Sequence, residues 1–210
     1  MKKLALLAIL MLIVSTAFAA DYRVGDGNGT PWSNSDRDTY TCDDGTGTNG
    51  LYQDNLTVYG NAFDVGAGGQ LTTLEFVHHA WQELHGPYDY KVFVYAEDDC
   101  TVLYEIGPLQ AADAYDTYET ETVDMTSYGI VVAGNVVVGI QALSLSPFGY
   151  YHPTVAFEEL PLDGCMRQVD IGTSSGCSTP SDSGDFAIRI TVEPTTAAAP
   201  FNFSAVKALY

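Results

Sequence analysis

Oxygen-bearing residues near the start of the chain have the spacing of a calcium-binding loop. Asp26-Gly27-Asn28-Gly29-Thr30 places donors at alternate positions, as the first half of an EF-hand loop does. The sixth position of that loop should be glycine and is Pro31, and the twelfth should be glutamate and is Arg37, which excludes an EF-hand. The acids of this region then either solvate the surface or build an irregular, weak calcium site. The expected ligands of such a site are Asp36, Asp38, Asp43 and Asp44.

Two further patterns resemble parts of catalytic or metal sites, and their context argues against both. Gly172-Thr173-Ser174-Ser175-Gly176 matches the G-x-S-x-G nucleophile pattern, but that motif needs a strand before it and a helix after it, whereas here a loop continues. His78, His79 and His85 cluster around Trp81. Neighbouring strand residues point to opposite faces of a sheet, so only one of the first two could join His85 on a metal. We expect solvent-facing histidines beside an aromatic residue.

Aromatic residues gather at two turns and suggest a binding surface. The chain has 14 tyrosines and is 12% aromatic. Exposed rings stack on the apolar faces of sugars, while acids and amides nearby bind the hydroxyls. The alternative is that many of these rings fill the interior of a sandwich, which takes aromatics readily. The expected ligand-binding residues, from the two turns, are Trp81, Tyr88, Tyr90, Tyr150 and Tyr151.

The first residues have the pattern of an export signal. Lys2 and Lys3 precede an apolar run over residues 4–14, and Ala17-Phe18-Ala19 forms an A-x-A cleavage site. The run is shorter than the roughly 20 residues that a membrane-spanning helix needs. We therefore expect a cleaved signal peptide over residues 1–19, a secreted or cell-surface protein, and no membrane insertion after cleavage.

The charge of the chain limits its partners. It has 27 acidic and 8 basic residues, for a formal net charge of −19, and the basic residues beyond the leader are scattered singly. Nucleic-acid backbones and anionic membranes need clustered cations, so neither is an expected partner.

The four cysteines are Cys42, Cys100, Cys165 and Cys177. An even number in an exported chain predicts two disulfides, for which the sequence alone allows three pairings. Cys165 and Cys177 bracket a loop rich in Gly and Ser, so we expect them to pair, which leaves Cys42 with Cys100. No C-x-x-C spacing supports zinc.

The elements that must position these residues are strands. From Leu56 onward the pattern has a period of two, clearest for Phe186, Ile188, Ile190 and Val192, and Gly- and Pro-containing turns separate the segments. This predicts an all-β, antiparallel, jelly-roll-like sandwich of about eight strands. We expect the sandwich to span residues 20–193, followed by a linker over residues 194–200 and a C-terminal tail over residues 201–210.

Several short motifs resemble a known class of domain. The chain has Asp43-Asp44-Gly45 in an early loop and Asp185-Phe186-Ala187-Ile188-Arg189 in its last strand, with Leu74-Glu75-Phe76-Val77 between them. In this it is similar to bacterial secreted β-sandwich accessory domains of surface and multidomain proteins. The tail segment 203–210 resembles C-terminal ends of the Trp-Gly-x-Ile-Lys-x-Leu-Tyr kind, with Phe203-Ser204 in place of Trp-Gly. The resemblance implies an adhesive, accessory or carbohydrate-binding role and no catalytic residue.

Together these patterns predict a secreted, non-catalytic module that binds a glycan or a cell-surface protein. The cofactor that they suggest is calcium. The alternative is an extracellular glycan-active enzyme that uses loop carboxylates, which spacing alone cannot select among 27 acids. The sequence leaves the oligomeric state open.

Overall fold

The chain folds into antiparallel β-strands, as a computed structural model shows for residues 39–42, 49–50, 53–81, 84–158, 165–171, 176–179 and 184–194. The long strands are β3 (Thr57–Asp64), β4 (Gly69–His79), β5 (Tyr88–Ala96), β6 (Val102–Ala111), β7 (Tyr118–Asp124), β9 (Asn135–Ala142), β12 (Thr154–Glu158), β13 (Met166–Asp170) and β15 (Ile188–Glu193). The short elements are β1 (Thr39–Thr41), β2 (Asn49–Gly50), β8 (Val131–Val132), β10 (Ser144–Leu145), β11 (Tyr151–His152), β14 (Asp185–Phe186) and the 3-10 helix η1 (Thr126–Tyr128).

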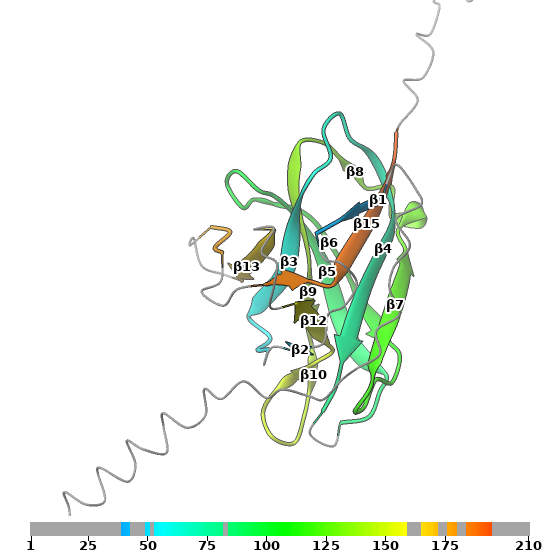
Figure 1. The fold of residues 1–210 in the computed structure, drawn as a ribbon, viewed down its shortest axis with the longest axis vertical. Coiled ribbons are helices and arrows are strands. Elements are labelled where there is room, and N and C mark those ends of the chain that lie inside the picture. Colours follow the sequence, from blue (N-terminus) through cyan, green and yellow to red (C-terminus); the bar gives the residue numbers. More distant parts are fainter. Residues whose placement is uncertain are drawn as a thin grey trace, which may run out of the picture.

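Two antiparallel sheets form a β-sandwich (Figure 1). The first sheet has eight strands with the main order β1-β15-β4-β12-β14, and β7 and β8 pair with β4 while β2 pairs with β12. In Figure 1 the orange β15 lies between the blue β1 and the green β4. The second sheet has five strands in the order β13-β3-β9-β5-β6. The all-β sandwich prediction is therefore confirmed. The described residues form fifteen strands where about eight were expected, because several are pieces of two or three residues.

The main core lies between the two sheets, and the period-two pattern explains which residues fill it. On β15 the buried side chains of Ile188, Ile190 and Val192 point inward, as their alternation predicts. On β9 the inward residues are Val136, Val138 and Ile140. A smaller apolar cluster occupies the opposite face of the second sheet and consists of Val58, Phe93, Tyr95, Val137 and Val169.

A buried amide joins the two sheets across the core. Asn61 on β3 donates its Nδ2–H to the carbonyl of Phe186 on β14 at 2.7 Å, and its Oδ1 accepts from the Phe186 N–H at 3.1 Å. Asn61 is fully buried. Because unpaired polar groups are costly in a core, this reciprocal pair fixes the position of β14 relative to β3.

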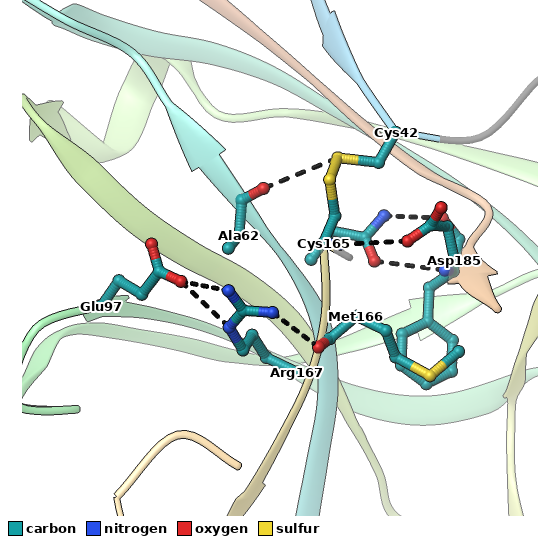
Figure 2. The surroundings of a disulfide bond; sticks show 9 residues. Cys42, Ala62, Glu97, Cys165, Met166, Arg167 and Asp185 are labelled. Atoms are coloured by element: carbon teal, nitrogen blue, oxygen red, sulfur yellow. Dashed lines mark hydrogen bonds and ion pairs between the residues drawn. A yellow bond between two sulfur atoms is a disulfide. The ribbon is translucent and has the colours of Figure 1, made fainter. Parts of the chain in front are cut away.

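Two disulfides fasten β13, and their pairing differs from the expected one. Cys42 bonds to Cys165 and Cys100 bonds to Cys177, so the predicted Cys165–Cys177 and Cys42–Cys100 pairs are wrong. Figure 2 shows that the first bond joins the segment after β1 to the start of β13. Each of the four cysteines is in a disulfide, as predicted.

Polar contacts support the start of β13 around the first disulfide. Arg167 forms an ion pair with Glu97, which follows β5, and its guanidinium donates to the Met166 carbonyl at 2.9 Å (Figure 2). The Cys165 N–H donates to Asp185 at 3.1 Å. The strand at the edge of the second sheet is thus tied to β5 and to the first sheet.

Candidate binding site

Three of the aromatic residues expected to bind ligand belong to the interior instead. Trp81, Tyr88 and Tyr90 are buried. Tyr90 packs edge-on against Phe76 with ring centroids 5.2 Å apart. The Tyr88 hydroxyl donates to Asp113 at 2.8 Å. These side chains therefore do not form an exposed platform. The sequence alone does not distinguish aromatic residues beside a turn that face solvent from those that fill a core.

The other two expected residues lie on a small hairpin formed by β10 and β11. Tyr150 and Tyr151 are half-buried, and the Tyr151 N–H donates to the Gln53 carbonyl at 3.1 Å. Beside them Leu145 and Phe148 are 54% and 60% exposed. The structure therefore does not bring the two predicted aromatic groups into one surface.

The expected calcium ligands Asp36, Asp38, Asp43 and Asp44 lie outside the described residues, as do residues 172–175 of the G-x-S-x-G motif 172–176 and the segments expected to be a signal peptide and a tail. Within the described ranges, no group of three or more His, Cys, Asp or Glu side chains is placed to hold a metal ion.

The expectation of solvent-facing histidines is wrong for two of the three. His78 and His79 are fully buried at the end of β4. Only His85 is exposed, and its Nδ1 lies 3.3 Å from the Asp113 carboxylate.

A hollow of about 270 Å³ lies on the outer face of the second sheet, away from the main core. Alternation along β5 explains its floor: Val92 and Val94 point into the main core, so Phe93 and Tyr95 point outward. The two outward rings stack with centroids 5.7 Å apart and an interplanar angle of 12°. The side chains that give the hollow its chemistry are Lys91, Phe93, Tyr95, Glu105, Gln141 and Asp170.

An ion pair lies at the rim of this hollow. The Lys91 ammonium is 2.6 Å from the Glu105 carboxylate, and the two side chains are 30% and 49% exposed. Both can therefore exchange part of their mutual contact for a ligand. Burial, and secondarily the charge of Glu105, raises the pKa of Tyr95 to about 12, so this phenol stays neutral at physiological pH.

The strands beside β5 supply the other polar groups. Gln141 on β9 is the cross-strand partner of Lys91, and its Nε2 donates to the Asn55 carbonyl at 2.6 Å. Asp170 at the end of β13 accepts from Thr57 at 3.3 Å. These hydrogen bonds hold an amide and a carboxylate in place on the other side of the aromatic floor.

The Cys100–Cys177 disulfide forms part of the wall of the hollow, because Cys100 lines it. Cys100 and Cys177 also pack against the outer apolar cluster. The bond joins the β5–β6 turn to the segment after β13, so it fixes two sides of the hollow relative to each other.

Sequence reasoning missed the residues of this hollow. One signal was present: Lys91, Phe93 and Tyr95 alternate on β5, which assigns a cation and two rings to one face of the strand. That this face points away from the core, and that Glu105, Gln141 and Asp170 lie near it, depends on strand pairing.

Comparison of the chain with protein-family models, curated proteins and solved structures found no match. Among the residues that the structure describes, no helix has the length and apolar character needed to cross a membrane.

Proposed function

We propose that this protein is a secreted, non-catalytic β-sandwich that binds glycans at the cell surface through the hollow on the outer face of its second sheet. The observation that carries the proposal is the accessible Lys91–Glu105 ion pair at the rim of a hollow whose floor is fixed by the buried, stacked rings of Phe93 and Tyr95. A sugar hydroxyl both donates and accepts hydrogen bonds, so it can bind between an ammonium donor and a carboxylate acceptor. Val102, which is exposed, and the half-buried Cys100 line the hollow and offer apolar contact to the ring carbons.

The disulfides agree with an extracellular or otherwise oxidising environment. Export by the N-terminal signal peptide and an accessory role like that of bacterial surface domains remain part of this proposal. Weak calcium binding by the early acidic loop also belongs to it, as a source of loop rigidity.

The test is binding of the purified exported protein to a panel of neutral, acidic and amino sugars, followed by calorimetry on any glycan that binds. Glu105→Gln keeps the size of the side chain but removes the charge that holds Lys91. We expect it to weaken binding by about tenfold, equivalent to about 1.4 kcal/mol. Glu193→Gln, an exposed glutamate at the end of β15, is the matched control and should leave affinity unchanged. Equal affinity of both variants would place the ligand elsewhere.

One observation favours a second candidate, a glycan-active enzyme. Glu105 and Asp170 line the same hollow, and most glycoside hydrolases use a pair of carboxylates. A panel of glycoside substrates separates the two functions. Turnover well above a heat-inactivated control that is lost in both Glu105→Gln and Asp170→Asn would replace the binding function with catalysis.

A further inference from the structure

Three buried histidines meet where strands of the first sheet change partners. His78 and His79 end β4, and His152 ends β11, two residues before β12 begins. The junction between β4 and β12 is short, with only two residue pairs, His79 with Thr154 and His78 with Val155. The Thr154 hydroxyl also donates to the His79 carbonyl at 2.8 Å. We call His78, His79 and His152 the histidine cluster.

Aromatic rings join the three members of the histidine cluster. Trp81 lies against His79 and His152, with ring centroids 5.2 and 5.5 Å away. Tyr88 lies 6.3 Å from His78 and 6.1 Å from His152. The cluster therefore reaches both faces of the first sheet and touches the start of β5 in the second sheet.

The ring nitrogens of the histidine cluster are buried and make no hydrogen bond of normal geometry with a described residue. All three side chains are fully buried, and the backbone of His79 lies close enough to His152 to favour protonation of that ring. A neutral imidazole can be held in such a place by packing, whereas an imidazolium would need an anion or water. Burial lowers the pKa of His78, His79 and His152 to about 4 each.

The charged and titratable groups around the cluster offset only part of this lowering of the histidine pKa values. Asp116, before β7, favours protonation of His79, and the positive form of His79 disfavours protonation of its neighbours. The other described groups that face the cluster are neutral or exposed. Tyr118 on β7 stacks on His79 at 4.8 Å, Tyr88 on β5 bonds to Asp113, and Glu119, the cross-strand partner of His78, is exposed. At β12 the paired residues Thr154 and Val155 carry no charge.

We propose that the histidine cluster is an acid-sensitive latch: its neutral rings hold the ends of β4 and β11 and the start of β12 together, and protonation opens this end of the sandwich before the rest unfolds. Opening is local and occurs on the β12 side, because the β4–β12 junction has two residue pairs, whereas β4 pairs with β15 over six and with β7 over seven, His78 and His79 included. The opened segment gives the imidazolium rings access to water.

The direction of the pH dependence follows from the lowered pKa values. An opened histidine titrates near its ordinary pKa of 6.5 and a closed one near 4. The open state therefore binds more protons between these values, and opening becomes more favourable as pH falls from about 6.5 to about 4. At pH 5 a single such site shifts the equilibrium toward the open state by about 30-fold, and the other two sites shift it in the same direction.

Trp81 reports on this latch directly because it packs between two of its members. The chain has two tryptophans, and Trp32→Phe leaves Trp81 as the only one. The experiment follows Trp81 emission and far-ultraviolet circular dichroism together from about pH 7.5 to about pH 3.5. We expect the emission to shift to longer wavelength between about pH 6 and about pH 4, at a higher pH than any loss of strand signal.

The variants separate the histidine cluster from other acid effects. His79→Gln and His152→Gln remove one titrating ring each and should move the Trp81 transition to lower pH. The control is His85→Gln, which changes an exposed histidine and should leave the transition in place. If a cluster variant does not fold, nuclear magnetic resonance of the parent protein decides, since three histidine C2–H signals should titrate below about pH 5.

The proposal is overturned by any of four results. The first two are constant Trp81 emission down to about pH 4 and an emission change that coincides with loss of the strand signal. The third is an emission change that His85→Gln moves as much as the cluster variants do. The fourth is titration of all histidine C2–H signals near the ordinary histidine pKa.

Discussion

Removing the Cys100–Cys177 disulfide should destabilise the protein and impair the hollow together. The bond closes a loop with a sequence separation of 77. The chain-entropy model gives about 4.5 kcal/mol for a loop of that length, and measured values are typically about 2–4 kcal/mol. We therefore expect Cys100→Ala with Cys177→Ala to lower the free energy of unfolding by about 2–4 kcal/mol. That loss is a large part of the free energy of unfolding of a typical domain, which is about 5–15 kcal/mol.

The matched control is Cys42→Ala with Cys165→Ala, which removes the other disulfide. Its sequence separation is 123, so the same model gives about 4.9 kcal/mol and a comparable loss of stability. Only the first double variant removes a wall of the hollow, because Cys100 lines it. Glycan affinity should therefore fall more in the Cys100/Cys177 variant than in the Cys42/Cys165 variant. Both affinities are measured under conditions in which both variants are folded.

Urea unfolding without reductant measures the loss of stability, and the slope of each transition checks that it stays two-state. A change of less than about 0.5 kcal/mol in the Cys100/Cys177 variant would refute the reasoning. Peptide mapping without reduction gives an independent check: it should recover Cys42 linked to Cys165. Recovery of Cys165 linked to Cys177 would contradict the structure itself.

Two further substitutions test the packing of β3. Asn61→Ala leaves the Phe186 N–H and carbonyl without their cross-sheet partner, so we expect urea unfolding to show a free energy of unfolding lower by about 2–4 kcal/mol. The control is Asn135→Ala, at an exposed position. Equal losses of stability in the two variants would contradict a bridging role for Asn61. Gly60→Ala places a methyl carbon 2.4 Å from the Val138 carbonyl oxygen, so the strands must separate at a cost of about 1–3 kcal/mol. An unchanged urea midpoint would show that β3 and β9 do not approach this closely.

The strands were predictable because their signal is local. Alternation places Ile188, Ile190 and Val192 on one face of a strand, and the structure points that face into the core. The same reasoning gave no guide to Trp81 or Tyr90. Whether an aromatic ring beside a turn is exposed depends on which strand covers it, and strand pairing is not encoded within one segment.

The prediction of the disulfide pairing was wrong for a geometric reason. Cys165 and Cys177 are close in sequence, but β13 runs between them as an extended strand. Ser178 pairs with Gln168, which places Cys177 beside Val169. Four strand residues span about 13 Å, whereas the Cα atoms of a disulfide lie about 4.4–6.8 Å apart. A loop rich in Gly and Ser therefore does not bring these cysteines together once β13 forms.

The strand β5 connects the two features on which the proposals rest, the histidine cluster and the hollow. At its start Tyr88 contacts the histidine cluster, and after its end Cys100 enters the disulfide beside the hollow. Lys91, Phe93 and Tyr95 lie between these ends. The Cys100 end of this segment is thus fixed by a covalent bond that does not respond to mild acid, and the Tyr88 end packs against uncharged imidazole rings. In the proposed latch, acid loosens the Tyr88 end of β5 while the disulfide holds the Cys100 end in place, which predicts that the hollow changes shape without the sandwich coming apart.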